Sequence, residues 1–352
     1  MKFENLNNCL NSLKDKKIIL LINEKNEKYN GCLVYPSQYL TNEILNFIKN
    51  SSNSRPFITK NNNVDISNNE LELNNLPIYL TKNEHVLIND DFSVASLDLM
   101  KLANLQSSSL CCLMFDKNNK SIKYDELIEF ANKNNIHYLT IKELQEYHKV
   151  NDNLVECTSV VNMPTKYGIF KAHCYVNKLN GEHHIALVMG ELNHPNNVMC
   201  RVHSECLTGD VFGSLRCDCG PQFDKAMKMI SKNKSGVLLY MRQEGRGIGL
   251  VNKLRAYKLQ EQGMDTLQAN LVLGFEGDMR EYYIAAQILR DLKIKSLELL
   301  TNNPEKLNQL EDYGIKIAKR LPIEIVANEY DESYLKTKKS KMGHMLEISI
   351  DK

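Results

Sequence analysis

The sequence has no long apolar run and almost no net charge. No stretch approaches the roughly 20 apolar residues that a membrane-spanning helix needs. Residues 1–17 mix acidic, amide and basic side chains where a signal peptide would have an apolar middle. The 44 Lys and Arg residues balance 43 Asp and Glu residues to a formal net charge of +1, so no global field attracts nucleic acid or an anionic membrane. We expect a cytoplasmic protein, with no nucleic-acid or membrane partner, whose functional charges act inside a pocket.

The ten cysteines do not predict a disulfide framework, because cytosolic thiols stay reduced. Seven of them lie in apolar or unpatterned surroundings and are expected to be small buried hydrophobes. These seven are Cys9, Cys32, Cys111, Cys112, Cys157, Cys174 and Cys200.

The chain is predicted to form two α/β domains, residues 1–152 and 153–352. Its 352 residues exceed one compact core of ordinary size, and the Asn-, Lys- and Ser-rich texture of the first part ends near Val150. Further on, buried-strand runs such as 237–240 alternate with helical segments such as 222–231. This alternation indicates a three-layer α/β domain with a mixed sheet.

The remaining three cysteines occupy one short segment. Cys217 and Cys219 are separated by one residue, so both sulfurs point to the same side of an extended chain. A turn at Gly209 or Gly213 would bring Cys206 back to them. Three thiolates leave one position of a zinc tetrahedron open, as in catalytic sites, where a bound water has its pKa lowered to about 7.

Two other interpretations of this segment remain open. The cysteines could hold a closed structural zinc ion with His203 or a distant residue as the fourth ligand, or they could be free thiols. Spacing alone favours a metal but does not separate a catalytic from a structural site. The neighbouring ionisable groups favour a catalytic site: Arg201, His203, Glu205, Asp210, Arg216 and Asp218.

A glycine-rich loop, residues 240–249, follows a buried strand and opens a helix. Such a loop presents backbone N–H groups to an anion, although glycines also simply make turns. Arg246 within the loop can grip a phosphate with two hydrogen bonds. Glu244 could accept from the N1–H and N2–H₂ edge of guanine, or be a solvated loop carboxylate.

Five further residues are candidates for a ligand site. Asp278 and Arg280 lie on one side of an extended segment, where the alternative is an ordinary surface ion pair. Thr301 and Lys306 lie at a strand end and the following helix start, where α/β proteins bind ligands. Tyr257, on the helix after the glycine loop, is by default a core or surface tyrosine.

Together and in this order, five segments closely resemble GTP cyclohydrolase II of riboflavin biosynthesis. The resemblance runs from about residue 163 to residue 345 and is specific, because several long motifs coincide at the right spacings. The segments are RVHSECLTGDVFGSLRCDCG (201–220), YMRQEGRGIGL (240–250), NKLRAYKLQEQG (252–263), LTNNP (300–304) and YLKTKKSKMGH (334–344).

The resemblance implies hydrolysis of GTP to 2,5-diamino-6-(5-phosphoribosylamino)pyrimidin-4-one, formate and diphosphate by a homodimer. It implies one Zn²⁺ per chain on the three clustered cysteines and Mg²⁺ with the GTP phosphates. Asp278 would be the proton acceptor, Arg280 the nucleophile towards the α-phosphate, and Tyr257 would orient water or substrate. The implied GTP contacts are Arg201, Val202, His203, Ser204, Glu205, Gln222, Glu244, Gly245, Arg246, Thr266, Thr301 and Lys306.

Three alternatives to this assignment are kept. A guanidinium stays protonated, so Arg280 is chemically easier to accept as a stabiliser of charge on the transferring phosphoryl group than as a nucleophile. The chain could also be a non-catalytic, zinc-stabilised GTP-binding scaffold, or an enzyme that stops at a formylated pyrimidine. A formate assay and the mass of the product distinguish these cases.

The first domain resembles, more faintly, 3,4-dihydroxy-2-butanone 4-phosphate synthase, most clearly over residues 124–147. That family's acidic, metal-holding loop, D-D-E-x-R-E-N-E-G-D, is here residues 23–32, with Lys28 and Cys32 in place of carboxylates. Because Mg²⁺ needs hard oxygen ligands, we expect a reduced α+β domain that has lost synthase activity and serves a structural or dimerising role. The alternative is a divergent but active synthase.

Overall fold

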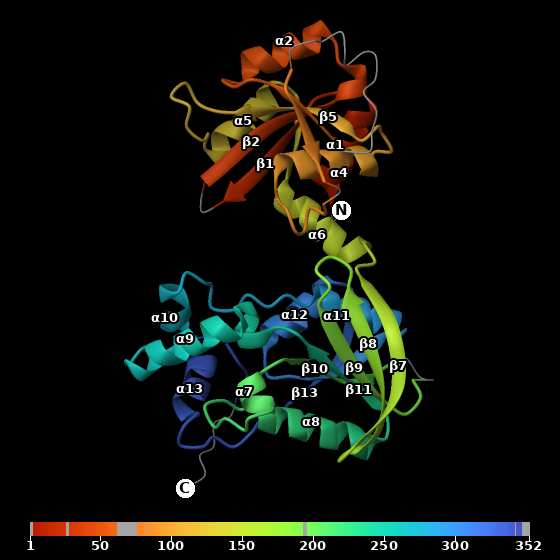
Figure 1. Ribbon diagram of the computed structural model, residues 1–352, viewed down its shortest axis with the longest axis vertical. Coiled ribbons are helices and arrows are strands. Elements are labelled where there is room, and N and C mark those ends of the chain that lie inside the picture. Colours follow the sequence, from red (N-terminus) through yellow and green to blue (C-terminus); the bar gives the residue numbers. More distant parts are fainter. Residues whose placement is uncertain are drawn as a thin grey trace. The chain divides into compact units, whose positions relative to one another are not determined.

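The computed structural model describes residues 3–25, 28–61, 76–82, 84–192, 196–341 and 343–346. The chain forms two compact units, Met1–Asn151 and Asp152–Lys352, and each contains a mixed sheet with helices (Figure 1). The prediction of a two-domain α/β protein is therefore confirmed. Among the described residues, no helix is long and apolar enough to cross a membrane.

The first unit is a six-stranded sheet covered on both faces. Along β1 (Ile19–Lys25), Ile19 and Leu21 pack into one core with α1 (Glu4–Lys14), α4 (Phe92–Leu102) and α6 (Ile141–Asn151). Leu20 and Ile22 pack into another core with α2 (Asn42–Ser51) and α5 (Tyr124–Lys133). This alternation is the period-two pattern of a strand buried on both sides. The sheet order is β4 (Ile78–Thr81), β3 (Phe57–Asn61), β5 (Ser108–Met114), β2 (Lys28–Pro36), β1 (Ile19–Lys25) and β6 (His137–Thr140).

The helices of the first unit fall between these strands along the chain. They are α1 (Glu4–Lys14), α2 (Asn42–Ser51), α4 (Phe92–Leu102), α5 (Tyr124–Lys133) and α6 (Ile141–Asn151), with a short 3₁₀ turn, η1 (Ser37–Tyr39).

The second unit is built on a seven-stranded sheet with two kinds of pairing. An antiparallel meander forms one side and parallel strands form the other. The order is β13 (Lys316–Leu321), β12 (Ser296–Leu300), β10 (Val198–Ser204), β11 (Gly236–Met241), β9 (His183–Met189), β8 (Gly168–Asn177) and β7 (Val155–Thr165).

The three neighbouring parallel strands β12, β10 and β11 determine where a site can form. Their carboxyl ends meet at one edge of the sheet, where α/β proteins bind ligands. The cysteine segment follows β10, the glycine loop follows β11, and Thr301 follows β12. Pro304 occupies the first turn of α12 (Pro304–Asp312) after the Asn303 cap.

Helices cover this sheet and complete the pocket at its edge. Ala226 and Ile230 of α8 pack on Leu238 of β11 and Leu300 of β12. The helices are α7 (Leu207–Asp210), α8 (Cys219–Asn233), α9 (Gly249–Glu261), α10 (Thr266–Val272), α11 (Tyr283–Asp291), α12 (Pro304–Asp312) and α13 (Glu332–Lys341), with a 3₁₀ turn, η2 (Glu244–Gly247).

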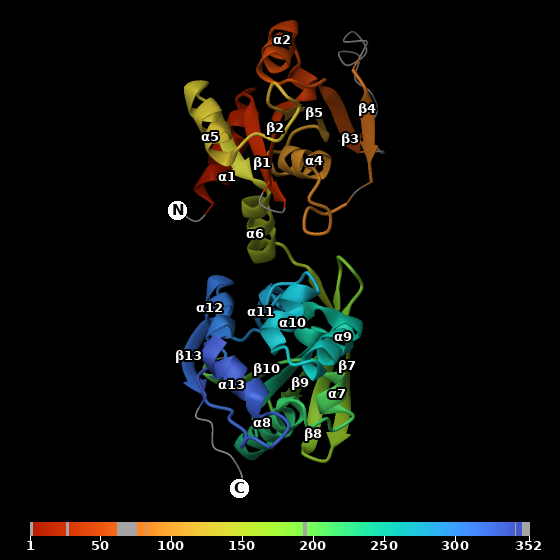
Figure 2. The same cartoon turned by 90° about the vertical axis from the view of Figure 1, so that its left-hand side faces the viewer.

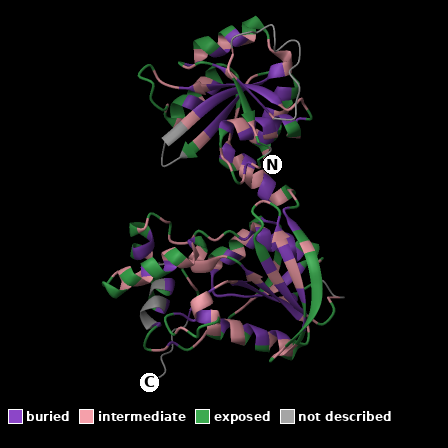
Figure 3. Cartoon of the chain, in the orientation of Figure 1, coloured by how far each residue is buried: buried purple, intermediate pink, exposed green. Residues whose placement is uncertain are grey.

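Five of the seven cysteines expected in the core are buried there, but Cys157 and Cys174 are only half-buried. For these two the prediction is wrong. Cys157 lies on β7, the edge strand of the larger sheet, whose side chains are mostly exposed (Figure 3), and Cys174 lies on the strand beside it.

Candidate active site

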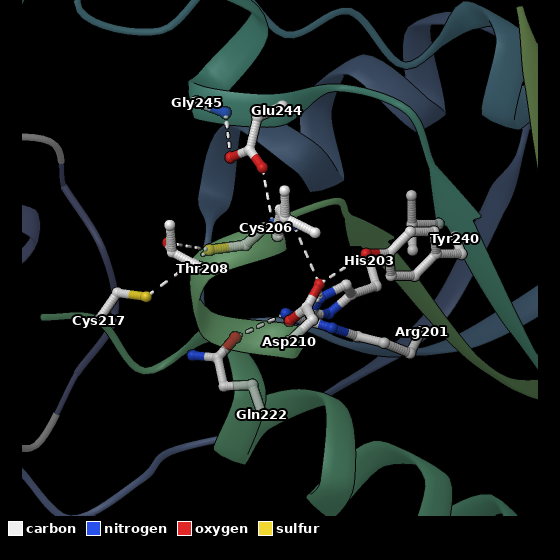
Figure 4. Close-up of polar contacts among 12 residues, drawn as sticks. Arg201, His203, Cys206, Thr208, Asp210, Cys217, Gln222, Tyr240, Glu244 and Gly245 are labelled. Carbon is white, nitrogen blue, oxygen red and sulfur yellow. Dashed lines mark hydrogen bonds and ion pairs between the residues drawn. The ribbon is translucent and has the colours of Figure 1, made fainter. Parts of the chain in front are cut away.

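Three cysteine sulfurs form a compact group at the carboxyl edge of the larger sheet. Cys206 directly precedes α7, Cys219 begins α8, and Cys217 lies in the loop between these helices. The three Sγ atoms lie within 4.8 Å of one another, with 3.7 Å between those of Cys206 and Cys217 (Figure 4). The cysteines are therefore placed to hold one metal ion.

The backbone around the sulfurs is shaped to leave room for this group. A Cβ atom added at Gly209, within α7, would lie 3.0 Å from Cys217 Sγ, 3.1 Å from Cys206 Sγ and 3.1 Å from the Cβ of Cys219. These distances are shorter than ordinary carbon–sulfur contacts. A glycine at this position lets α7 close over the three sulfurs, and a set of three soft thiolate donors is one that zinc favours.

The thiols depend on one another for their charge. Hydrogen bonds from Cys217 and Cys219, with the Lys253 ammonium, hold the pKa of Cys206 well below its usual value. The hydrogen bond to Cys206 and burial raise the pKa of Cys217 to about 11, and the same thiol neighbours raise the pKa of Cys219. Three thiolates in this space therefore require a cation among them.

Lys253 of α9 links the cysteine group to the glycine loop. Its Nζ lies 3.1 Å from Cys206 Sγ, 2.9 Å from Thr208 Oγ1 and 2.8 Å from Glu244 Oε1, and its side chain is 10% exposed. A buried ammonium in contact with a thiolate and a carboxylate compensates part of the negative charge of both. The metal group and the loop are thus held together by one cation.

The Glu244 carboxylate is not a solvated loop group. Its Oε1 accepts from the backbone N–H of Gly245 at 2.9 Å (Figure 4). The same oxygen accepts from Lys253, and Oε2 accepts from the backbone N–H of Leu207 at 2.7 Å. The side chain is 10% exposed. Each carboxylate oxygen offers two lone pairs, so Oε2 can accept one more hydrogen bond from a ligand in the pocket.

The glycine loop adopts a left-handed conformation that brings it onto the segment containing Asp278 and Arg280. Gly245 and Arg246 have φ values of 61° and 62°. A Cβ at Gly247 would lie 3.1 Å from the backbone carbonyl of Met279, and Met279 N donates to Arg246 O at 3.0 Å. The non-glycine Arg246 in this conformation marks a constrained backbone of the kind found at functional sites.

Asp278 and Arg280 form a mostly buried pair, so the surface ion-pair interpretation is wrong. Arg280 Nε donates to Asp278 Oδ1 at 2.8 Å, and Arg280 Nη2 contacts Oδ2. The Arg280 side chain is 15% exposed and the Asp278 side chain is 22% exposed. Burial raises the pKa of Asp278, but the adjacent guanidinium outweighs burial and holds the pKa below its usual value. The carboxylate thus fixes the guanidinium by a two-point contact.

Two more cations lie beside Arg280. Arg201 is 7% exposed and donates to the backbone carbonyl of Leu300 at 2.9 Å and to Gln222 Oε1 at 2.6 Å. Lys306 is 3% exposed and donates to the Val202 carbonyl at 2.7 Å. Burial, with repulsion from Arg201 and Arg280, lowers the pKa of Lys306. An anion among these three cations would relieve their repulsion.

His203 pairs with a carboxylate rather than with the sulfurs. Its Nε2 lies 3.0 Å from Asp210 Oδ2, and the same oxygen accepts from Tyr240 OH at 2.8 Å and from Cys206 N at 3.0 Å (Figure 4). The group of ligand atoms that lie within 4.8 Å of one another contains the three sulfurs and neither ring nitrogen of His203, so His203 is not placed as a fourth ligand. Asp210 instead connects the histidine to the start of the cysteine segment.

The family model of GTP cyclohydrolase II matches residues 156–322, and that of 3,4-dihydroxy-2-butanone 4-phosphate synthase matches residues 75–147. The riboflavin biosynthesis protein RibBA of Bacillus subtilis is 47% identical over 268 residues, which are 76% of this chain and 67% of the relative. RibBA of Aquifex aeolicus is 48% identical over 252 residues, 71% of this chain and 62% of the relative.

The chain belongs to the RibBA family. Its second unit is a GTP cyclohydrolase II domain, and the synthase match falls in its first unit. The alignment spans about two thirds of the length of these curated relatives. The fold is shared by a crystal structure of RibBX from A. baumannii, which is described as a two-domain 3,4-dihydroxy-2-butanone 4-phosphate synthase. The TM-score is 0.61 at 19% sequence identity, and the match covers 90% of this chain and 99% of that one.

One pocket of this RibBA-family chain collects most of the residues that the sequence singles out. Val202 and Asp278 are not in its lining, because Val202 is buried beneath the site and Asp278 supports Arg280 from the side. The predicted residues that line the pocket are Arg201, His203, Ser204, Glu205, Cys206, Cys217, Cys219, Gln222, Glu244, Gly245, Arg246, Tyr257, Thr266, Arg280, Thr301 and Lys306.

Among the other residues of the pocket lining are three ionisable ones, Lys253, Lys338 and His344, that are not predicted from the sequence. All three fall in segments that carry the resemblance, residues 252–263 and 334–344. The resemblance of those segments to the family is the one signal in the sequence that points to these three residues. Their positions in the sequence show no pattern that links them to the cysteines or to the cationic residues.

Gly209→Ala should impair metal binding without unfolding the unit, because the new Cβ would press on two of the three sulfurs. We expect the zinc content of the purified protein to fall by more than half, measured by elemental analysis. Gly213→Ala is the matched control: its Cβ position is open, although its φ of +66° disfavours alanine, so zinc content should stay at the wild-type level. Full zinc content in Gly209→Ala would show that the glycine is not needed for the group.

Proposed function

We propose that residues 153–352 catalyse the zinc-dependent hydrolysis of GTP to 2,5-diamino-6-(5-phosphoribosylamino)pyrimidin-4-one, formate and diphosphate, the first step of riboflavin biosynthesis. The observation that carries this proposal is the meeting, in one pocket, of a three-thiol group, the buried cations Arg201 and Lys306, and the mostly buried Arg280. A metal-binding group alone would suit many hydrolases. The adjacent cations suit a substrate that carries several phosphates.

Cys206, Cys217 and Cys219 would hold the zinc ion, and the space left by Gly209 and the soft donor set fit it. Zinc with three protein ligands activates a water at neutral pH. Glu244 would accept from the guanine edge through the remaining lone pair of Oε2, at a position fixed by Lys253 and by the N–H groups of Leu207 and Gly245. The purine would then lie over the cysteine group.

The triphosphate would extend from there towards the cationic side, with Mg²⁺ on its phosphates. Arg201 and Lys306 are held by backbone carbonyls and Arg280 by Asp278, so each cation is in place before an anion arrives. Preorganised charges of this kind stabilise developing negative charge at little reorganisation cost.

For Arg280, the two-point contact with Asp278 supports stabilisation of charge on the α-phosphate over attack as a nucleophile. A guanidinium paired with an ionised carboxylate keeps its proton and its orientation. In the alternative role, Asp278 would accept the proton that Arg280 must lose. Tyr257 remains a neutral phenol, since burial raises its pKa to about 12, and would orient water or substrate by hydrogen bonding.

Cys217→Ser tests the metal centre. We expect zinc content and formate release from GTP to fall together, because a serine hydroxyl is a poor replacement for a thiolate ligand. Formate release should drop at least a hundredfold in a coupled dehydrogenase assay, in line with the contribution of about 3 kcal/mol or more that an activated catalytic group makes. Cys157→Ser, on the exposed strand β7, is the control and should keep both at wild-type level. Full turnover by a zinc-free variant would refute the proposal.

For residues 1–152 we propose a structural or dimerising role without synthase activity. Cys32, which stands where the synthase loop has a carboxylate, is fully buried in the core of the first unit beside Cys111. A thiol packed in an apolar core is no ligand for Mg²⁺. Formation of a homodimer is part of the same proposal.

Incubation of the full chain with ribulose 5-phosphate and Mg²⁺ should give no dihydroxybutanone phosphate, because the carboxylates needed to hold the metal are replaced. The product is followed by mass spectrometry, with formate release from GTP in the same preparation as proof that the protein is folded. Turnover of ribulose 5-phosphate would establish a divergent, active synthase instead.

A further inference from the structure

The C-terminal segment of the second unit forms part of the wall of the nucleotide pocket. Helix α13 packs against α10, and the chain continues through residues 343–346 (Figures 1 and 2). Lys338 of α13 and His344 just after it line the same pocket as Arg280 and Lys306. Neither has a role in the function proposed above.

A buried ion pair ties this segment to the cysteine group. Lys338 Nζ lies 2.6 Å from Oδ1 of Asp218, the residue between two of the clustered cysteines, and the two side chains are 10% and 3% exposed. Oδ2 of Asp218 accepts from Gln222 at 2.6 Å, and Gln222 in turn accepts from Arg201 at 2.6 Å. Loss of one partner from such a pair leaves a buried charge without compensation.

Two further contacts fix the chain beyond α13. His344 N donates to Lys338 O at 3.1 Å, and Met345 N donates to Asn302 O at 2.9 Å, in the loop that follows β12. Leu346 packs with Leu335 of α13 and with Ala327 in a small apolar cluster. His344 is therefore held between α13 and the carboxyl end of β12, on the cationic side of the pocket.

The surroundings of His344 suit a neutral hydrogen-bond donor to an anion. Burial, with the positive charges of Lys338, Arg280 and Arg246, lowers its pKa to about 3. The imidazole is thus uncharged in the free protein and carries one N–H group. A phosphate placed among these cations would lie within their field and could accept from that N–H.

We propose that His344 is a further ligand of the substrate's phosphate chain and that the Lys338–Asp218 pair latches the C-terminal segment over the pocket. Lys338 is a positioning residue in this account, because it acts through the segment that it holds. The inference rests on the proposed function only in requiring a ligand with a phosphate chain. It does not require that the guanine ring is opened.

The test measures binding to the full-length, zinc-loaded protein by calorimetry, with inorganic tripolyphosphate and guanosine as separate probes. His344→Ala should weaken tripolyphosphate binding about tenfold or more, the value of one hydrogen bond to a charged acceptor, and leave guanosine binding unchanged. His344→Gln retains an N–H donor and should recover part of the loss. Unchanged tripolyphosphate binding in His344→Ala, or no binding by the wild-type chain, would overturn the inference.

Lys338→Met tests the latch, with Lys339→Met, an exposed neighbour on α13, as the matched control. We expect Lys338→Met to weaken tripolyphosphate binding and to speed backbone hydrogen exchange over residues 335–346, whereas the control changes neither. Unchanged exchange in Lys338→Met would refute the latch. Intact tripolyphosphate binding that depends on His344, without formate release from GTP by the wild-type chain, would support this inference and contradict the proposed reaction.

Discussion

Three thiol sulfurs within 4.8 Å of one another form the constraint on which the rest of the second unit depends. Charges of one sign at this distance repel, and burial strengthens the repulsion. The ammonium of Lys253 contacts Cys206 and compensates part of this negative charge. The glycine at position 209 leaves space among the sulfurs. Both features are difficult to explain as packing alone. They fit a group that holds a divalent cation.

The same constraint orients the rest of the pocket. The Lys253 ammonium also contacts the carboxylate of Glu244, the residue proposed to recognise guanine. Glu244 is therefore fixed in position relative to the three cysteines. On the opposite side, Asp218 connects the cysteine loop to Arg201 through Gln222 and to α13 through Lys338. The residues proposed for base recognition, metal binding and phosphate binding thus share one network of buried polar contacts, in which a change at one place disturbs the others.

The sequence predicts best what is encoded locally. The cysteine spacing, the glycine loop and the Asp278–Arg280 motif each lie within a short segment, and the alternation of strands and helices indicates the α/β class. The contacts of Lys253 and His344 depend on how distant helices dock, which no local pattern records. Likewise, the half-burial of Cys157 follows from the place of β7 at the sheet edge, and that place is set by strand order rather than by the residues around Cys157.

X-ray absorption at the zinc edge of the full-length protein distinguishes an open zinc site from a closed one. We expect one zinc ion per chain with three sulfur ligands at about 2.3 Å and one lighter oxygen ligand, the pattern of an open, catalytic centre. Four protein ligands, with a fourth sulfur or a histidine nitrogen in place of the oxygen, would mean a closed structural site. That result, or a protein that binds no zinc at all, would refute the proposal that the three cysteines hold a catalytic zinc ion.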